Sequence, residues 1–351
     1  MSLQTIFVTN RNVNRGKDAK KHLFGNDLAK PAQLSFASAT AWDKQIIRKR
    51  KLSNKITRTY KSVKKTYQLA LLNEAQRTHY LQDIIANPGN DRPWLVFLHG
   101  NNQTLSKNLM KSRQIQDEYQ VNIVIFSWPS KSYEPQTMPA LVLTALLAAN
   151  PSTVALAKWT GKKAFQKKVK QYRVARKVAE KTAPQFSQAL AIIRDELLLP
   201  LRQQHNPHTC LLVHSLGHHV LRTVVETDHA IDPEYEFNTC LLHQADEEDQ
   251  NHQTWAAKMS MVRTNSTYVT RNKFDSVLLL SGIVNNDFDL RQALTRLGNR
   301  SNRDSQQGSP LNYIEFSGLD DVGIGHGIAW DDGRSPEVDA LCRPVLTGAD
   351  I

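Results

Sequence analysis

Short runs of strand-forming residues that alternate with helical patterns most constrain the fold of this chain. Four such runs, separated by helical patterns, lie in residues 93–102, 121–130, 209–213 and 237–243. A short, continuous apolar run is typical of a strand buried on both faces of a parallel sheet. Because strands that alternate with helices build such sheets, the sequence predicts an α/β fold with a mostly parallel sheet and helices on both faces. Further strands are expected at residues 5–11, 266–270 and 313–316.

Two regions depart from this alternation. Residues 12–65 are polar and are expected to be irregular, and a basic run covers residues 46–67. Residues 67–87 show the 3–4 spacing of a helix. Residues 131–181 form an insertion that is first apolar and then strongly basic, and it is expected to be helical.

No internal repeat is visible, and the alternation resumes after the insertion, so one domain with insertions fits this organisation better than two independent domains. The sequence predicts three parts: an N-terminal strand with a basic, helical extension in residues 1–92, an α/β core in residues 93–130 and 182–351, and an apolar and basic helical insertion in residues 131–181 that is a candidate lid.

The segment TCLLVHSLGHHVLR places Ser215 between a strand and a helix. A serine becomes a nucleophile when a base takes its proton and an acid orients the base. Nucleophilic serines occur on such strand-to-helix turns, usually within the pattern G-x-S-x-G. Here Val213 stands at the first glycine position of that pattern. Alone, the turn fits both a nucleophile and a plain polar residue at the end of a buried strand.

An acid and a histidine follow Ser215 in the order that such a triad requires. Asp275 comes a few residues after a strand-like run, and His326 lies in a glycine-rich loop after the last expected strand. Asp246 follows the preceding strand and is the alternative acid, although Asp275 is preferred. The joint order of these residues, each at a strand end, favours the nucleophile over the plain polar residue.

The same pattern suggests where an oxyanion would be stabilised. The backbone N–H of Asn101, after the strand that ends in His-Gly, and the N–H of Leu216, at the start of a helix, are the candidate donors. His214 and His218 flank the serine and are expected to be structural. Three aromatic residues are candidates for lining the substrate site or its lid: Trp128, Trp159 and Phe165.

The charge of the chain points to anionic partners. Its 45 Lys and Arg residues against 33 Asp and Glu residues give a formal net charge of +12. The basic runs at residues 48–65 and 158–181 fit an element that contacts an anionic membrane surface, and they equally fit solvated basic surfaces. Nucleic acid is not expected as a partner, because no recognised nucleic-acid-binding module is present.

The cysteines, the start of the chain and the apolar segments indicate the cellular compartment that we expect for the protein. Cys210, Cys240 and Cys342 are far apart and form no C-x-x-C pair, so neither a zinc site nor a disulfide framework is implied. The start of the chain lacks a signal-peptide pattern, and the apolar window at residues 138–159 is interrupted too early to span a membrane. The expected location is the cytoplasm, or export by a route without a signal peptide. No metal and no cofactor are expected.

Seven segments resemble a bacterial α/β-hydrolase family of largely unassigned function. They read IFVTNR (6–11), FLHGNN (97–102), FSWPS (126–130), VHSLGHHVL (213–221), QAD (244–246), KFDSVL (273–278) and GHG (325–327). The resemblance implies that Ser215 is the nucleophile, Asp275 the acid and His326 the base. The chain departs from the family pattern at Val213, where Gly or Ala is usual, and at Asn101, where Tyr is usual.

These observations predict a serine carboxylester hydrolase of the esterase or lipase type that works through an acyl-enzyme. A lipid or phospholipid ester is the preferred substrate class because of the apolar and basic insertion, and a small soluble ester is the fallback. Two alternatives remain: a hydrolase-like fold that binds anionic membranes or proteins without catalysis, and a toxin or effector lipase.

Overall fold

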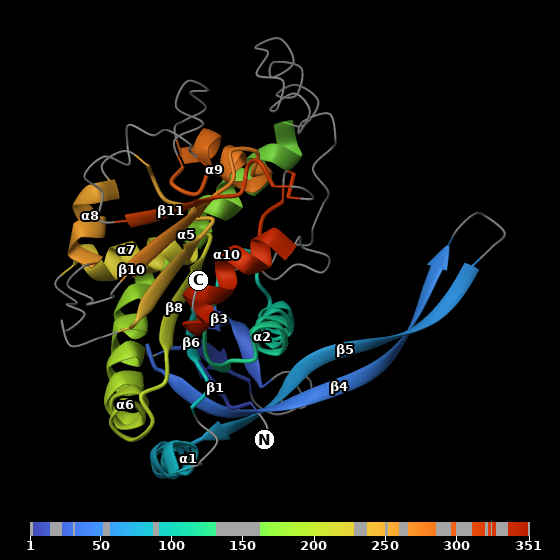
Figure 1. Cartoon of the computed structure of the whole chain (residues 1–351). Helices are drawn as coiled ribbons and strands as arrows, with labels where there is room; N and C mark the ends of the chain where they lie inside the picture. Colours follow the sequence, from blue (N-terminus) through green and yellow to red (C-terminus); the bar gives the residue numbers. More distant parts are fainter. Residues whose placement is uncertain are drawn as a thin grey trace.

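A nine-stranded sheet forms the centre of the molecule in the computed structural model (Figure 1). The structure describes residues 3–14, 23–30, 32–51, 57–86, 91–130, 162–227, 237–249, 252–259, 266–285, 296–299, 311–319, 322–323, 325–327 and 336–349. The strand order is β11-β10-β9-β8-β6-β7-β1-β4-β5. All neighbours from β11 to β1 pair in parallel, and β4 and β5 add an antiparallel edge.

The strands of this sheet are β1 (Thr5–Thr9), β4 (Ser35–Lys51), β5 (Thr57–Leu72), β6 (Trp94–Leu98), β7 (Asn122–Ser127), β8 (Thr209–His214), β9 (Thr239–His243), β10 (Ser266–Arg271) and β11 (Leu311–Glu315). A separate antiparallel pair consists of β2 (Arg11–Val13) and β3 (Phe24–Leu28).

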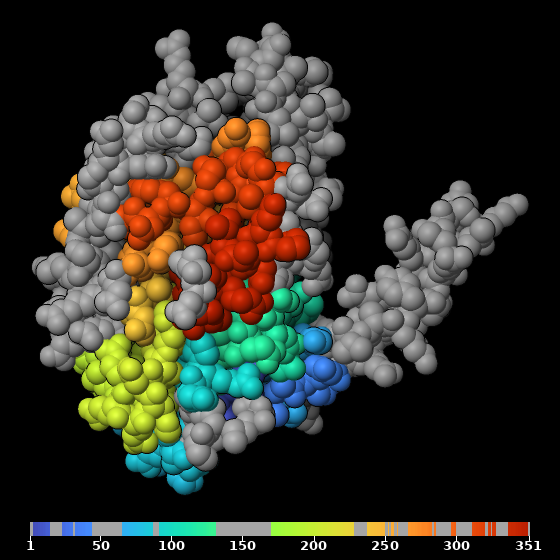
Figure 2. All heavy atoms as spheres, viewed as in Figure 1, coloured from blue at the N-terminus to red at the C-terminus, as the bar shows by residue number. Residues whose placement is uncertain are grey.

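Helices cover both faces of the sheet. They are α1 (Glu74–Ala86), α2 (Leu105–Tyr119), α5 (Lys162–Ile193), the π-helix η1 (Arg194–Leu198), α6 (Leu199–Gln204), α7 (Gly217–Glu226), α8 (His252–Met259), α9 (Ser276–Asn285) and α10 (Pro336–Thr347). Residues of α1, α5, α6, α7 and α8 pack into the core on one face, and residues of α2 and α10 pack on the other. Figure 2 shows α2 and α10 side by side on the second face. None of the helices in the described part of the chain has the length and hydropathy that crossing a bilayer requires.

The central strands are apolar on both sides because both sides are covered. In β6, Trp94, Val96 and Leu98 belong to the core on one face, while Leu95 and Phe97 belong to the core on the other. This two-sided burial explains why these strands read as continuous apolar runs rather than as alternating patterns. The predicted fold class, a mostly parallel α/β sheet with helices on both faces, is confirmed.

The N-terminal region differs from the expectation. Residues 12–65, expected to be irregular, contain β2, β3, β4 and most of β5, and the helix expected in residues 67–87 begins only at Glu74, because β5 continues to Leu72. Beyond Ser38, β4 pairs only with β5, so most of these two strands forms a two-stranded ribbon. Such a ribbon lacks the apolar alternation that marks a half-buried strand, so its sequence resembles a polar loop.

The insertion also differs from the expected arrangement. Residues 131–161, and with them Trp159, lie outside the described residues. The helix α5 begins at Lys162 and runs without a break to Ile193, so the expected boundary at residues 181–182 falls inside one helix. The basic segment from Lys162 is therefore the first part of the helix whose later residues Ala179 and Phe186 are wholly buried in the core. Phe165 belongs to this helix, and its side chain lies outside the described residues.

Candidate active site

Ser215 occupies a strained turn between β8 and α7. Its φ of 53° lies in the left-handed region, which is unfavourable for a residue with a Cβ atom and is often found at functional sites. The turn is held by its backbone: the N–H of Ser215 donates to His243 at 3.2 Å, and the carbonyl of Ser215 accepts from His218 at 3.1 Å and from Asp246 at 3.3 Å. The serine therefore stands on a well-braced elbow at the carboxyl end of a central strand.

Two glycines make room for this elbow. A Cβ atom added at Gly100 would lie 2.6 Å from the Cβ of Ser215, and one added at Gly217 would lie 2.9 Å from the carbonyl oxygen of His99. The loop after β6 and the first turn of α7 thus approach the serine more closely than a side chain at these glycines would permit. Val213 is wholly buried, and the elbow forms although valine replaces the usual small residue there.

Asp275 and His326 contact each other beside this elbow. Oδ2 of Asp275 lies 2.7 Å from Nδ1 of His326, and Asp275 is wholly buried. Its other oxygen, Oδ1, accepts from the N–H groups of Val277 and Leu278 at 2.9 and 3.0 Å, so the carboxylate also caps α9. The ring of His326 lies 4.9 Å, centroid to centroid, from the ring of His214. The preferred acid, the expected base and the serine turn are therefore neighbours.

Gln244 joins the acid to the loop that carries the histidine. Its Nε2 donates to Oδ2 of Asp275 at 2.7 Å and to the carbonyl of Gly325 at 2.9 Å, and its Oε1 accepts from the N–H of Gly327. Gln244 is wholly buried and its φ is 47°. The only feature of the sequence that marks Gln244 is its place in the QAD segment, which did not suggest a functional role.

Asp246, the alternative acid, is engaged in a different cluster. It pairs with the buried guanidinium of Arg296 at 2.9 Å and accepts from the hydroxyls of Tyr172 at 2.9 Å and of Ser281. Because burial and the carboxylate of Asp246 disfavour ionisation of the phenol, the pKa of Tyr172 is raised above its ordinary value. Of the two candidate acids, Asp275 contacts His326, and Asp246 contacts Arg296.

The loop that carries Asn101 is anchored from below by His99 and Trp128. The indole N–H of Trp128 donates to the carbonyl of His99 at 2.7 Å, and the backbone N–H of Trp128 donates to Nε2 of His99 at 3.1 Å. Trp128 is wholly buried. It was expected to line the substrate site or the lid, and its position differs from that expectation, because it lies beneath the loop and is not accessible to a substrate.

A buried arginine supports the same loop. The guanidinium of Arg11 donates to the backbone carbonyls of Trp128 at 2.6 Å and of Gln103 at 3.2 Å, and burial lowers its pKa to about 9. No carboxylate of the described residues pairs with it. Arg11 connects the end of β1 to the loops after β6 and β7. Its one sequence signal was the IFVTNR segment.

The histidines that surround the elbow are buried. Burial lowers the pKa of His99 to about 3 and that of His218 to about 4, and it lowers the pKa values of His214 and His243 well below 6.5. His218 holds the elbow through Nδ1, which donates to the carbonyl of Ser215 at 2.6 Å. These four histidines are therefore neutral at pH 7.

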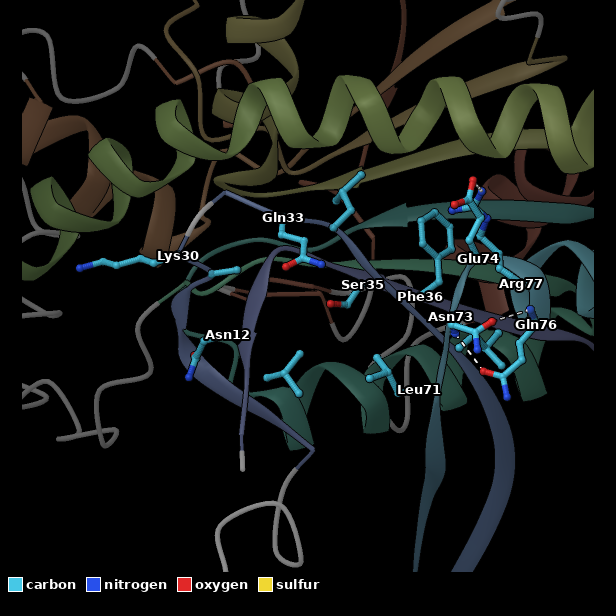
Figure 3. A pocket seen from close by; sticks show the side chains of 14 residues that line it. Asn12, Lys30, Gln33, Ser35, Phe36, Leu71, Asn73, Glu74, Gln76 and Arg77 are labelled. Carbon is cyan, nitrogen blue, oxygen red and sulfur yellow. Dashed lines mark hydrogen bonds and ion pairs between the residues drawn. The ribbon is translucent and has the colours of Figure 1, made fainter. Parts of the chain in front are cut away.

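A cavity of about 900 Å³ lies in another part of the molecule, beside the start of β4, the end of β5 and the start of α1 (Figure 3). Its lining includes Phe36, Leu71 and Arg77. The guanidinium of Arg77 pairs with Glu196 at 2.6 Å and lies 4.9 Å from the ring centroid of Phe36. None of the sequence-predicted site residues lines this cavity, so it is separate from the serine elbow.

Within the described ranges, no group of three histidine, cysteine or carboxylate side chains is placed to hold a metal ion.

Comparison with known proteins identifies one family. A family model described as "Alpha/beta hydrolase of unknown function (DUF900)" matches residues 73–326, which is more than half of the chain. Comparison with curated proteins and with solved structures finds no match. The matched range contains β6 to β11, the serine elbow, Asp275 and His326.

Proposed function

Because the chain belongs to this α/β-hydrolase family of unknown function, we propose that it is a serine hydrolase that cleaves carboxylic esters through an acyl-enzyme. Ser215 is the nucleophile, His326 is the general base and acid, and Asp275 orients the imidazole. The backbone N–H groups of Asn101 and Leu216 stabilise the oxyanion.

In the first half of the reaction, Oγ of Ser215 attacks the ester carbonyl carbon and His326 takes the hydroxyl proton. The carbonyl oxygen becomes an oxyanion that accepts hydrogen bonds from Asn101 and Leu216. Leu216 directly precedes α7, so the positive end of the helix dipole also favours the negative charge. When the tetrahedral intermediate collapses, the bond to the alcohol breaks and His326 gives its proton to the leaving oxygen.

In the second half, water attacks the acyl-enzyme. His326 takes a proton from the water, a second tetrahedral intermediate forms, and its collapse returns the proton to Oγ of Ser215 and releases the carboxylic acid. Asp275 keeps Nδ1 of His326 as the donor, so that Nε2 is the nitrogen that exchanges protons.

The observation that carries this proposal is the joint arrangement at the elbow. Ser215 has a φ of 53°, and the imidazole that bonds to Asp275 at 2.7 Å packs against His214, the residue before the serine. A fold used only for binding has no need to hold a buried carboxylate and an imidazole together beside a strained serine. This favours a hydrolase over a binding module without catalysis.

A lipid or phospholipid ester is the proposed substrate class, and the net charge of +12 supports it, since anionic lipid surfaces attract cationic proteins. A small soluble ester is the alternative substrate. A role as a toxin or effector lipase is compatible with the same chemistry. A panel of phospholipid vesicles, triglyceride emulsions and short soluble esters separates these classes by the rate of acid release.

The decisive test uses a fluorophosphonate probe and p-nitrophenyl esters. The probe should label Ser215, and Ser215→Ala should lower hydrolysis on the order of 10⁴-fold or more, because the other groups cannot replace the nucleophile. Ser112→Ala is the matched control: Ser112 is a buried serine on α2, and its loss should leave labelling intact. Labelling of another residue, or full activity of Ser215→Ala, would overturn the proposal.

A further inference from the structure

Asn272 lies at the junction of the two segments that carry the proposed acid and the proposed base. It directly follows β10, precedes the turn of Asp275, and is wholly buried. Its backbone carbonyl accepts from the N–H of Asp275 at 3.0 Å, and its side-chain Oδ1 accepts from the N–H of Phe274 at 3.1 Å. An asparagine that bonds to the backbone two residues later forms such a turn. Asn272 therefore shapes the turn that carries the carboxylate of Asp275.

The amide nitrogen of the same side chain holds the loop of His326. Nδ2 of Asn272 donates to the carbonyl of Gly323 at 3.0 Å and to the carbonyl of Gly325 at 3.3 Å. The partners define the orientation of the amide, because Oδ1 faces an N–H group and Nδ2 faces two carbonyls. One side chain thus joins the turn of the acid to the loop of the base.

The loop of His326 needs such contacts because of its glycines. The φ of Gly323 is 47° and that of Gly327 is 90°, and glycine has the greatest backbone freedom of any residue. A loop of this composition keeps one conformation only when other segments hold it. Gln244 bonds to the loop close to His326, and Asn272 extends the anchoring back to Gly323.

Asn272 is itself held by a third segment. Its backbone N–H donates to the carbonyl of Gly298 at 2.9 Å, and the N–H of Gly298 donates to the carbonyl of Ala245 at 2.9 Å. A Cβ atom added at Gly298 would overlap the backbone nitrogen of Ala245, so this close approach requires glycine. The next residue, Asp246, donates its N–H to the carbonyl of Ser215 at 3.3 Å. The end of β10 is thereby aligned with the serine elbow.

We propose that Asn272 is a positioning residue that sets the contact between Asp275 and His326, an inference that rests on the proposed hydrolase function. The reaction requires Nδ1 of His326 to stay on the carboxylate while Nε2 exchanges protons. Asn272 bonds to the backbone on both sides of this contact, so it keeps the acid and the base in register. Because a misplacement of about 1 Å is enough to slow a reaction strongly, loss of Asn272 affects proton transfer rather than binding of the ester.

The test uses two substitutions of this residue. Asn272→Asp keeps the acceptor for the N–H of Phe274 but replaces the donor to the loop by an oxygen. Asn272→Ser also keeps an acceptor for that N–H, is too short to reach the loop, and adds no charge. In both, kcat for a soluble ester should fall on the order of 10- to 100-fold with little change in KM. Urea unfolding checks that each variant folds, and the neutral variant decides if the carboxylate prevents folding.

Asn122→Asp is the matched control. Asn122 is also buried, but it begins β7 at the opposite end of the sheet, and its Oδ1 accepts from the N–H of Gln4 at 2.8 Å. The same substitution keeps this acceptor and places the same charge in the core, away from the site. It should leave kcat and KM unchanged, so a fall in kcat equal to that of Asn272→Asp would overturn the proposal.

Amide hydrogen exchange measured by NMR gives a readout that does not depend on hydrolysis. In both variants of Asn272 the N–H groups of Gly325 and Gly327 should exchange on the order of 10-fold faster than in the wild type, because the loop loses hydrogen bonds that hold it. Wild-type exchange, or faster exchange together with wild-type kcat, would overturn the proposal. A fully active Ser215→Ala would mean that the proposed hydrolase fails, and the exchange data separate that failure from a failure of Asn272 to hold the loop.

Discussion

Ser215 and Gln244 lie at matching positions at the ends of neighbouring strands. The parallel register pairs His214 of β8 with His243 of β9, and the next residue of each strand turns into the left-handed region, with φ of 53° at Ser215 and 47° at Gln244. The N–H of Ser215 donates to the carbonyl of His243, so the two turns brace each other. One turn presents the proposed nucleophile, and the other presents the amide that holds the proposed acid.

The first prediction concerns this amide. Gln244→Met keeps the size of the side chain but removes the donor to Asp275 and both contacts to the histidine loop. We expect kcat for a soluble ester to fall on the order of 10- to 100-fold with little change in KM, because the loss affects the positioning of His326 rather than substrate binding. Steady-state kinetics measure this. Gln116→Met is the control, because Gln116 is also buried and hydrogen-bonded but lies on α2; it should lower stability and leave kcat unchanged.

A double-mutant cycle separates positioning from mere packing. If Gln244 acts through Asp275, then Gln244→Met should lower kcat by a much smaller factor in an Asp275→Asn background than in the wild type. Additive effects on kcat would show that the glutamine does not act through the acid.

The second prediction distinguishes the two candidate acids. Asp275→Asn should lower kcat on the order of 10⁴-fold, because the imidazole loses the partner that fixes its tautomer. Asp246→Asn leaves the buried guanidinium of Arg296 without its anion, so it should cost about 3–5 kcal/mol of stability while the folded enzyme keeps most of its kcat. Urea unfolding and steady-state kinetics on both variants decide between them, and the reverse pattern would make Asp246 the acid.

The third prediction tests how closely the oxyanion loop approaches the serine. In Gly100→Ala the new methyl group would lie 2.6 Å from the Cβ of Ser215, so the loop with the N–H of Asn101 must move away. Loss of one oxyanion donor should lower kcat on the order of 10²- to 10³-fold. Gly318→Ala is the control, since a Cβ atom there meets nothing within 4 Å. Equal activity in the two variants would remove Asn101 from the oxyanion hole.

The central sheet could be predicted from the sequence because its strands are buried on both faces. β6 is wholly apolar and β8 is apolar except at its ends, and such runs between helical patterns have few other structural solutions. The β4–β5 ribbon could not be predicted in the same way. The sequence of its outer part shows no apolar alternation, and the register of Arg50 with Arg58 contradicts the local preference for unlike charges across strands.

The candidate site likewise contains residues that short motifs reveal and residues that they do not. Ser215, Asp275 and His326 belong to short motifs at strand ends, so their order along the chain is informative. Gln244 and Arg11 act through buried hydrogen bonds to backbone carbonyls and amides in distant segments. Such partners are defined only when the folded strands bring the loops together. Trp128 shows the opposite effect, because an aromatic residue in the FSWPS segment suggested substrate contact, whereas its indole N–H donates to the carbonyl of His99.

The last prediction follows from the neutral histidines beneath the site. The folded state lowers the pKa of His99 to about 3 and that of His218 to about 4 through burial, whereas an unfolded histidine titrates near 6.5. Between these values the unfolded chain binds more protons, so the stabilisation from a neutral buried histidine is fully present above about pH 6.5 and is lost as the pH falls. When the pH falls from 7.5 to 5.5, each such histidine should lower the free energy of unfolding by about 1.4 kcal/mol.

Urea unfolding at these two pH values measures this dependence, and one substitution isolates a single histidine. In His218→Asn the amide nitrogen replaces Nδ1 as the donor to the carbonyl of Ser215, but the side chain takes up no proton. The loss of stability between pH 7.5 and 5.5 should therefore be smaller than in the wild type by about 1.4 kcal/mol. His79→Asn is the control, because the side chain of His79 is 77% exposed. The free energy of unfolding of this variant should change with pH as it does in the wild type. An unchanged pH dependence in His218→Asn would mean that His218 does not resist protonation in the folded protein.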